Sequence, residues 1–140
     1  MENALVDDLP ELVPFLNQSH PTGQLTVIEA GTVGCFPVKR VYFLHSIAPG
    51  AVRGSHAHKN LQQLIVPVSG SFLVQTEKSG VRTDFLMDSP STGLFVKPFT
   101  WRTLTNFSEG AVCMVLASEH YDESDYIRDY AEFLSSGPRG

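Results

Sequence analysis

The stretch GAVRGSHAHKNLQQLIVPVSG, residues 50–70, decides the fold. It carries two histidines, His56 and His58, two residues apart behind a pair of glycines. In a β-strand, residues at i and i+2 project from the same face, so the two imidazoles are predicted to point into one pocket. The histidine strand is predicted to continue through residues 61–66, whose apolar side chains fit the wall of a barrel, and the stretch ends at a turn glycine, Gly70. We therefore expect a β-barrel with a histidine pair inside it.

The chain on either side of this stretch also has β character. Between Leu25 and Leu116, short apolar runs are interrupted roughly every eight to twelve residues by Gly, Pro, Ser or Asp, which is typical of an all-β sandwich or barrel. A short amphipathic helix is predicted at Ser124–Leu134 and a loose tail at residues 135–140. Residues 77–80 are predicted to form a hairpin tip. The predicted strands are Leu25–Glu29, Arg40–Ser46, Gln63–Ser69, Ser71–Lys78, Val81–Met87, Gly93–Val96, Arg102–Asn106 and Ala111–Ser118.

Length and composition limit the class of protein. The chain has 140 residues, 42% hydrophobic and 18% charged, which predicts a single globular domain over residues 1–140 with its core at about 23–134. A net charge of -5 and scattered Lys and Arg count against nucleic-acid binding, although a few pocket arginines could still bind a small anion. The sequence contains neither a signal-peptide pattern nor the roughly 18 consecutive apolar residues of a membrane span. We expect a cytoplasmic protein that contacts no membrane.

The two cysteines, Cys35 and Cys113, are far apart and belong to no CxxC or Cys/His spacing. A disulfide framework or a zinc site is therefore not expected. Both residues are predicted to be buried thiols, because free cysteine is among the most buried residue types.

The quoted stretch resembles the first motif of the cupins, G-x5-H-x-H-x4-E-x6-G, at every position but one, where Gln63 replaces the acid. Residues 93–106 are similar to the second cupin motif, and Arg102 occupies the position of its metal-binding histidine. A cupin metal site usually combines three imidazoles with a carboxylate. Here two histidines, an amide and a guanidinium would remain, and Arg can neither lose its proton nor ligate a cation. We expect no metal, and the alternative to a functional pocket is a pair of hydrogen-bonded histidines in a decayed barrel.

A closer resemblance covers most of the chain, from about Gly23 to Phe133. The runs KRVY (39–42), RGSHAHK (53–59), GLFV (93–96), WR (101–102) and ASEHYDESDYIR (117–128) are similar to the nucleotide-sugar 3,4-ketoisomerases, metal-free WxcM-like members of the RmlC-like cupins. The resemblance implies a jelly-roll β-barrel, a homodimer and no cofactor. It also implies conversion of a dTDP-linked 4-keto-6-deoxyhexose into its 3-keto isomer, ahead of a PLP-dependent aminotransferase in deoxyamino-sugar synthesis.

The resemblance and the chemistry of the side chains suggest catalytic roles. A neutral imidazole is a suitable base at neutral pH, and His56 is the expected acceptor of the C3 proton. His58 would orient His56, relay a proton or contact the sugar. The phenol of Tyr42 could act as the acid or donate to the developing oxyanion, or Tyr42 could simply be a buried ring. Arg53 and Arg102 suit a pyrophosphate or an enolate, with a surface salt bridge as the alternative for each.

Three further residues are candidates for substrate binding. Gln63 could hydrogen-bond a sugar hydroxyl or a histidine, and Trp101 could stack on the thymine or the sugar, or fill the mouth of the barrel. Thr22, together with Arg102, is expected to shape the sugar pocket. The residue before the first histidine is usually aromatic in this family but is Ser55 here. The acidic, aromatic run after Ala117 is interpreted first as a structural edge, with a role at the nucleotide site or a dimer contact as the alternative.

Other functions remain open at this point. The same groups would serve a 3- or 5-epimerase, in which the proton returns to the carbon that lost it. A non-catalytic sugar-nucleotide sensor would keep the pocket but would need no base. A metal-dependent cupin oxygenase would require a bound transition metal.

Overall fold

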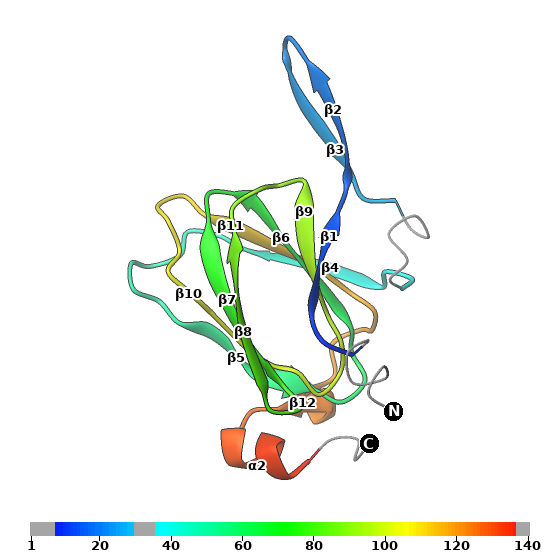
Figure 1. The fold of residues 1–140 in the computed structure, drawn as a ribbon, viewed down its shortest axis with the longest axis vertical. Helices are drawn as coiled ribbons and strands as arrows, with labels where there is room; N and C mark the ends of the chain where they lie inside the picture. The colour runs from blue at the N-terminus through cyan, green and yellow to red at the C-terminus, as the bar shows by residue number, and fades with distance from the viewer. Residues whose placement is uncertain (1–7, 30–35, 137–140) are drawn as a thin grey trace.

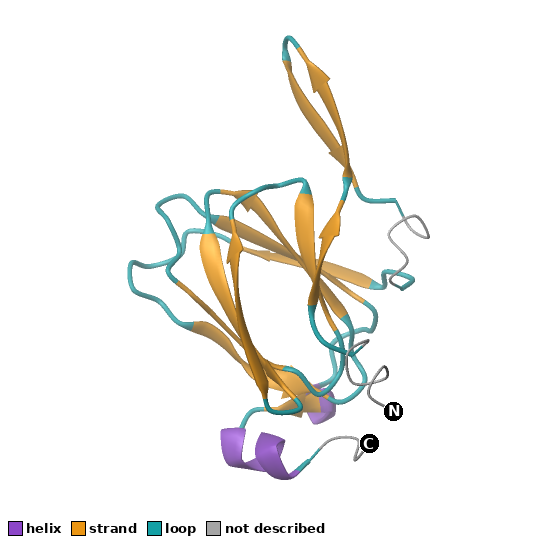
Figure 2. Ribbon diagram, in the orientation of Figure 1, coloured by secondary structure: helices purple, strands orange, loops and turns teal. Residues whose placement is uncertain are grey.

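The computed structural model describes residues 8–29 and 36–136, and within them the chain is almost entirely β-strand (Figures 1 and 2). A 3₁₀ turn, η1 (Glu123–Asp125), and a helix, α2 (Tyr130–Ser135), follow the main strands. The strands are β1 (Glu11–Pro14), β2 (Leu16–His20), β3 (Gly23–Val27), β4 (Arg40–Leu44), β5 (Arg53–His58), β6 (Gln63–Ser69), β7 (Phe72–Lys78), β8 (Val81–Met87), β9 (Thr92–Val96), β10 (Trp101–Thr105), β11 (Val112–Ala117) and β12 (Tyr126–Ile127).

Two antiparallel five-stranded sheets face each other and form the barrel. The first has the order β1-β9-β6-β11-β4 and the second β12-β5-β10-β7-β8. Inward-facing apolar residues fill the space between them, among them Ile65, Phe72 and Leu104. This packing follows from the pleat, since alternate residues of each strand face the core. The expected all-β barrel with a short C-terminal helix is confirmed.

The outer face of the first sheet carries a second apolar cluster. Phe15, Leu64 and Phe95 belong to it, and they alternate along the strands with residues of the inner core. On β4, Val41 and Phe43 extend this face, opposite Leu116 and Met114 of β11, but Phe43 is 59% exposed. The outer apolar layer is therefore incompletely covered within one chain.

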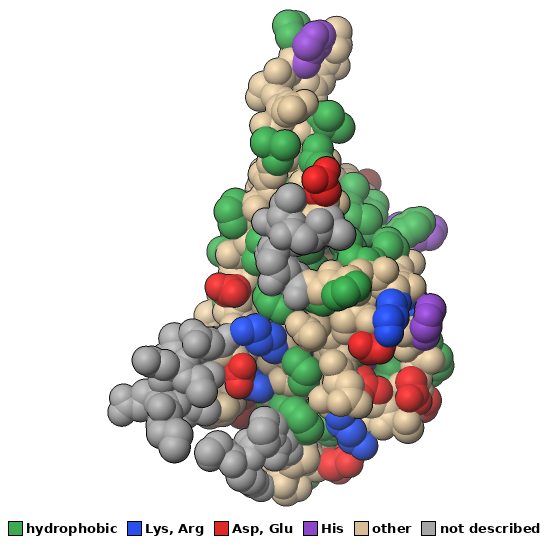
Figure 3. Space-filling model, turned by 90° about the vertical axis from the view of Figure 1, so that its right-hand side faces the viewer, with side chains coloured by type: hydrophobic (Ala, Val, Ile, Leu, Met, Phe, Trp, Pro, Cys, Tyr) green, Lys and Arg blue, Asp and Glu red, His purple; other side chains and the backbone are tan. Residues whose placement is uncertain are grey.

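The hairpin formed by β2 and β3 projects from the barrel (Figure 1). These two strands pair only with each other in the described part of the chain. Leu16 and Leu25 are exposed on the hairpin, and Figure 3 shows hydrophobic side chains exposed along it and on the adjoining surface of the barrel. A long, exposed hairpin with apolar side chains is an element without the partner it would normally pack against.

All eight predicted strands are present, with ends that differ by no more than two residues from the prediction. The hairpin tip is confirmed as well, because Ser79 and Gly80 both adopt positive φ between β7 and β8. The sequence reasoning missed β1, β2 and β12. It also treated β5 and β6 as one continuous strand, whereas the chain turns at residues 59–62 before β6 begins at Gln63.

The predicted helix at Ser124–Leu134 is wrong in its first half. Tyr126 and Ile127 instead form β12, which pairs with His58 and Ala57 of β5. The helix begins only after Asp129, whose side chain caps it by accepting a hydrogen bond from the Ala131 amide. The periodicity of this segment was helical, but pairing with β5 decided its conformation.

Two further predictions concern single residues and membrane contact. Cys113 is fully buried, as predicted, and burial raises the pKa of its thiol to about 12. Cys35 lies outside the described residues. No helix within residues 8–29 and 36–136 has the length and apolar character needed to cross a membrane.

Candidate active site

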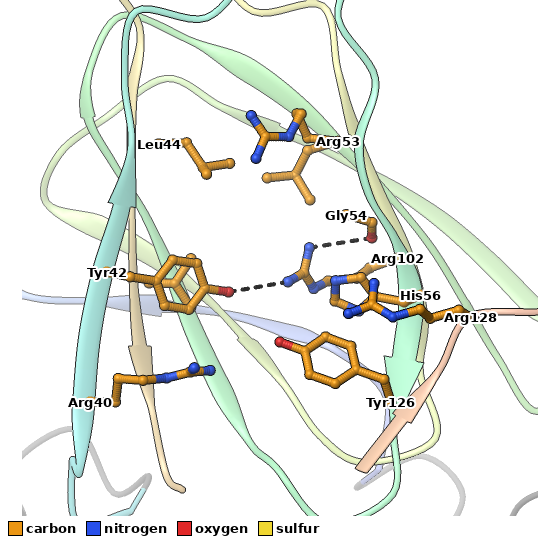
Figure 4. Close-up of a pocket in the computed structure, with 11 residues that line it drawn as sticks. Arg40, Tyr42, Leu44, Arg53, Gly54, His56, Arg102, Tyr126 and Arg128 are labelled. Carbon is orange, nitrogen blue, oxygen red and sulfur yellow. Dashed lines mark hydrogen bonds between the residues drawn. The ribbon is translucent and has the colours of Figure 1, made fainter. Parts of the chain in front are cut away.

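A pocket of about 420 Å³ opens between the two sheets at the end where β4 and β5 face each other (Figure 4). The strands β4, β5, β10, β11 and β12 supply most of its walls. The lining residues are Arg40, Tyr42, Leu44, Arg53, Gly54, His56, Arg102, Leu104, Val115, Tyr126 and Arg128.

The lining is strongly cationic. Arg40, Arg53, Arg102 and Arg128 all reach the pocket, and none of the described residues that line it is a carboxylate. The protein as a whole has a net charge of -5. A local concentration of guanidinium groups in an acidic protein indicates an anionic ligand, because guanidinium forks bind phosphate oxygens in pairs.

Arg102 forms the centre of a buried network at the floor of the pocket. It is only 3% exposed, and its Nε donates to Oε1 of Gln63 at 2.7 Å. Its terminal nitrogens approach the Tyr42 hydroxyl and the Gly54 carbonyl oxygen, both at 3.4 Å (Figure 4). Gln63 Nε2 donates to the same Tyr42 hydroxyl at 3.0 Å. Because that oxygen accepts two hydrogen bonds, the phenolic proton of Tyr42 is left to point elsewhere.

Gly54 allows this network to form. The register between β5 and β10 shifts between the pairs Arg102–His56 and Leu104–Arg53, so β5 carries one extra residue. Gly54 lies in this bulge with a φ of +66°, and a Cβ at this position would lie 2.4 Å from Nη1 of Arg102. The glycine is therefore required both by the turn of the backbone and by the guanidinium beside it.

His56 and His58 share one face of β5, as predicted. Their ring centroids are 4.8 Å apart and edge-on. Burial, followed by the charge of Arg102, lowers the pKa of His56 to about 2 and that of His58 to about 3, so both imidazoles are neutral at neutral pH. In the described structure, Nδ1 of His56 and both ring nitrogens of His58 are buried without a hydrogen-bond partner. Nε2 of His56 is thus the ring nitrogen of the pair that can meet a substrate.

Tyr126 separates His58 from the pocket. Its ring packs against His56 at 4.9 Å and against His58 at 4.4 Å, and its hydroxyl points into the pocket (Figure 4). The guanidinium of Arg128 lies 4.1 Å from the centre of the same ring. Two hydrogen bonds from Arg128 to Glu123, at 2.8 and 2.9 Å, hold the guanidinium in place and lower the pKa of the Glu123 carboxyl to about 2.

The donor set around the histidines does not fit a divalent metal. The two positions that would complete a cupin metal site hold the Gln63 amide, whose oxygen is engaged by Arg102, and the Arg102 guanidinium, which has no lone pair to offer. Among the residues that the structure describes, no three His, Cys, Asp or Glu side chains gather as metal ligands would.

The structure brings most of the predicted site residues together. Tyr42, Arg53, His56 and Arg102 line the pocket. His58 and Gln63 lie behind this lining, where each contacts a residue that does line it. Gln63 was expected to hydrogen-bond a sugar hydroxyl or a histidine. Its partners within the described chain are Arg102 and Tyr42.

Two predicted residues lie elsewhere. Trp101 neighbours Arg102 on β10 and therefore projects from the opposite face of the sheet, where it packs against Tyr130 and Phe133 of the C-terminal segment. It does not fill the mouth of the barrel. Thr22 is exposed in the turn of the projecting hairpin and does not line the pocket of its own chain.

Sequence reasoning missed Arg40, Tyr126 and Arg128. A signal for Arg40 was available, because it lies two residues before Tyr42 on β4 and so shares its face. Tyr126 and Arg128 are also two residues apart, but the run that contains them was interpreted first as a structural edge and a role at the nucleotide site was only the alternative. Only the pairing of β12 with β5 shows that this run forms one wall of the pocket.

Comparisons with known proteins identify the family of this chain. The family model described as "FdtA: WxcM-like, C-terminal" matches residues 7–137. The chain is 41% identical over 111 residues to TDP-4-oxo-6-deoxy-alpha-D-glucose-3,4-oxoisomerase of Aneurinibacillus thermoaerophilus, a match that covers 79% of this chain and 80% of that protein.

Solved structures show the same fold. A histidine-to-asparagine variant of the 3,4-ketoisomerase QdtA from Thermoanaerobacterium thermosaccharolyticum, in complex with TDP-4-keto-6-deoxyglucose, matches with a TM-score of 0.87 at 35% identity, over 90% of this chain and 91% of that one. A 3,4-ketoisomerase from Helicobacter canadensis matches with a TM-score of 0.86 at 35% identity, over 90% and 95% of the two chains. The barrel is thus an RmlC-like cupin, and the chain belongs to the FdtA family of WxcM-like proteins.

Proposed function

We propose that this protein is a sugar-nucleotide 3,4-ketoisomerase that converts a dTDP-4-keto-6-deoxyhexose into the dTDP-3-keto-6-deoxyhexose, with His56 as the base. The observation that carries the proposal is a neutral imidazole in a pocket lined by four arginines, facing a phenol on the opposite wall whose oxygen accepts two hydrogen bonds. The activities named for the relatives above support the same reaction.

The first step is removal of the C3 proton by His56. The C3–H bond breaks, its electrons form a C3=C4 double bond, and the carbonyl oxygen at C4 becomes an oxyanion. Arg102 lies beside His56 and is fixed by Gln63, so it can stabilise this negative charge without reorganising. The O3 proton then leaves as the C3 carbonyl forms, and C4 and O4 each take a proton.

Tyr42 is the proposed proton donor. Its oxygen accepts hydrogen bonds from Gln63 and Arg102, which leaves its own proton for the pocket and stabilises the phenolate that donation would produce. A donor on β4, facing a base on β5, lies on the opposite side of the pocket from that base (Figure 4). That arrangement allows one group to remove a proton while the other delivers one.

The arginines would bind the diphosphate of the substrate, and their charge also affects the pKa of His56. In the free pocket, burial and the charges of Arg102 and Arg128 disfavour protonation of His56. A bound diphosphate would offset that charge, so His56 should become more basic when the substrate is present. An acid limb of kcat at a higher pH than the acid limb of kcat/KM would support this coupling, and coincident limbs would count against it.

The proposed product carries a carbonyl at C3, where an aminotransferase could introduce nitrogen. We place the reaction ahead of such a step, in deoxyamino-sugar synthesis. The nucleotide assignment follows the TDP and TDP-sugar complexes of QdtA.

A homodimer is part of the proposal, with the hairpin β2–β3 packed on a second copy. Strand β4 is a free edge of the first sheet within residues 8–29 and 36–136, and its outer face exposes Val41 and Phe43. The hairpin of a partner could extend the sheet at this edge and cover that face. Because Thr22 lies outside the pocket of its own chain, its predicted role in the sugar site requires the pocket of the partner.

The dimer is tested by light scattering on the purified protein. A mass of two chains is expected, and Phe43→Glu should shift it toward one chain. Leu86→Glu is the matched control, since Leu86 is equally exposed but lies on β8 at the edge of the other sheet. A wild-type mass of one chain would contradict the proposal.

Product analysis tests the reaction. The protein is incubated with dTDP-4-keto-6-deoxyglucose in deuterated buffer, and the position of the carbonyl is followed by NMR. A carbonyl at C3 is expected. Deuterium only at C3 with the carbonyl still at C4 would instead indicate an epimerase, and binding of dTDP without turnover would indicate a sensor.

A further inference from the structure

A buried carboxylate stands next to the histidine pair but outside the pocket. Asp125 is 9% exposed, and its Oδ2 lies 3.4 Å from Nδ1 of His58, although not in the alignment of a good hydrogen bond. It does not line the cavity. Sequence reasoning assigned it no role, and the mechanism proposed above does not use it.

The backbone holds this carboxylate in one orientation. Oδ1 accepts a hydrogen bond from the Asn60 amide at 2.8 Å, and Oδ2 accepts one from the Leu61 amide at 3.2 Å. The backbone of Asp125 also bonds Lys59 and Asp122. These contacts anchor the turn between β5 and β6, which directly follows His58 on the chain. A purely structural anchor would explain the amide contacts but not the approach of Oδ2 to the imidazole.

Both ring nitrogens of His58 are buried, and the neutral ring carries a proton on only one of them. Burial keeps the ring neutral, and the charged groups that face it are Arg40, Arg102 and Arg128 on the cationic side and Asp125 on the anionic side. A neutral imidazole carries one N–H, and a carboxylate beside Nδ1 favours the proton on that nitrogen. The lone pair then lies on Nε2, which is buried without a hydrogen-bond partner. The rings of His56 and Tyr126 pack against this imidazole, with centroids 4.8 and 4.4 Å away.

We propose that Asp125 is a positioning residue of the isomerase, which fixes His58 in the Nδ1–H tautomer so that its lone pair stabilises the imidazolium formed on His56. The inference rests on the proposed role of His56 as the base. If the N–H of His58 instead faced His56, it would disfavour a positive charge on the His56 ring. The carboxylate thus acts through His58, in the way that a carboxylate orients a catalytic or metal-binding histidine in other enzymes.

Asp125→Asn is the decisive variant. The asparagine oxygen can still accept from the Asn60 amide, but its NH₂ cannot accept the bond from the Leu61 amide, which is lost. The NH₂ would also face Nδ1 of His58 and favour the opposite tautomer. We expect kcat to fall by about 10- to 100-fold, the range measured when such supporting groups are removed, with KM for the keto sugar nearly unchanged. The ¹⁵N chemical shifts of the His58 ring should show Nδ1–H in the wild type and Nε2–H in the variant.

Ser118→Ala is the matched control. The Ser118 hydroxyl accepts from the Gln62 amide at 2.8 Å and so anchors the same turn from its other side, without approaching either histidine. This variant should lose a similar amount of stability but keep both kcat and the His58 tautomer.

The inference is overturned if Asp125→Asn keeps the wild-type kcat, or if both variants lose activity in proportion to stability. It is also overturned if wild-type His58 carries its proton on Nε2. The proposed function fails by a different result, namely full turnover in a His56 variant. The tautomer measurement distinguishes the two, because it reports the Asp125 contact without relying on activity.

Discussion

The floor and the rim of the pocket both pair arginine with tyrosine, yet the two regions differ in almost every physical respect. The floor, which comprises Tyr42, Gly54, Gln63 and Arg102, is buried and linked by hydrogen bonds in one arrangement. The rim comprises Tyr121, Glu123, Tyr126 and Arg128.

At the rim, the Arg128 side chain is 53% exposed, and it is held by stacking on Tyr126 and an ion pair with Glu123. Exposed pairs of this kind contribute little to stability, whereas a buried guanidinium without its partners is costly. The difference suggests a division of labour. We propose that the floor positions the reacting groups and that the rim affects how the anionic part of the ligand is held.

The largest effect is expected for His56, which lies against the floor. His56→Asn keeps a polar side chain of similar size but removes the base, so kcat should fall by about 10³-fold while dTDP still binds. Steady-state kinetics and dTDP titration measure the two quantities. His45→Asn, on an exposed histidine outside the pocket lining, should leave both unchanged. Undiminished turnover by His56→Asn would remove the catalytic assignment.

Gly54→Ala should have the next largest effect, because it changes the backbone conformation and the space beside Arg102 in the floor. The new Cβ would meet the Arg102 guanidinium and would also force a non-glycine residue to a φ of +66°. We expect a loss of about 1–3 kcal/mol in unfolding free energy and a 10- to 100-fold lower kcat, since displacement by about 1 Å is enough to impair catalysis.

Gly50→Ala separates the two causes. Gly50 also has a positive φ, of +77°, but a Cβ there would meet nothing within 4 Å. It should lose stability and keep kcat. Equal kcat values for the two variants would show that Arg102 does not depend on the space at Gly54.

Part of the candidate site could be predicted from the sequence alone. The spacing of residues 50–70 predicted that His56 and His58 share one face, because a local rule, the alternation of side chains along a strand, was sufficient. The expectation of no metal came instead from the resemblance to the cupin motifs, at Gln63 and Arg102. The same rule applied to Trp101 would have excluded it from the pocket, since its neighbour Arg102 faces inward.

Asp125 could not be found in this way. Its contacts with Asn60 and Leu61 span more than 60 positions of sequence and exist only because β12 docks on β5. The strands β1 and β2 were not predicted because their short and largely exposed segments lack the apolar alternation of the core strands.

The histidine pair should also make the fold sensitive to acid. Both pKa values are lower in the folded protein than the ordinary value of 6.5, so the unfolded chain binds protons first and stability falls as the pH drops below about 6.5. Between pH 7.5 and 5, each histidine should contribute a loss of about 2 kcal/mol. Urea unfolding at the two pH values measures it, and His56→Asn should lose about half of the difference. A wild-type unfolding free energy that is unchanged at pH 5 would contradict the burial of neutral imidazoles.

The smallest effect is expected at the rim, from Glu123→Gln. The glutamine would keep one oxygen that can accept from the Arg128 guanidinium but would lose the negative charge and the second acceptor, so Arg128 would be less well oriented over Tyr126. KM for the keto sugar should rise by about 2- to 5-fold, in keeping with the small contribution of exposed ion pairs, and kcat should stay constant. Glu119→Gln, which breaks the exposed ion pair with Lys39 away from the pocket, is the control and should change neither. If Glu123→Gln instead lowered kcat as strongly as Gly54→Ala, the rim would share in the chemistry, because a residue that only holds the ligand affects substrate binding and not the reacting bonds.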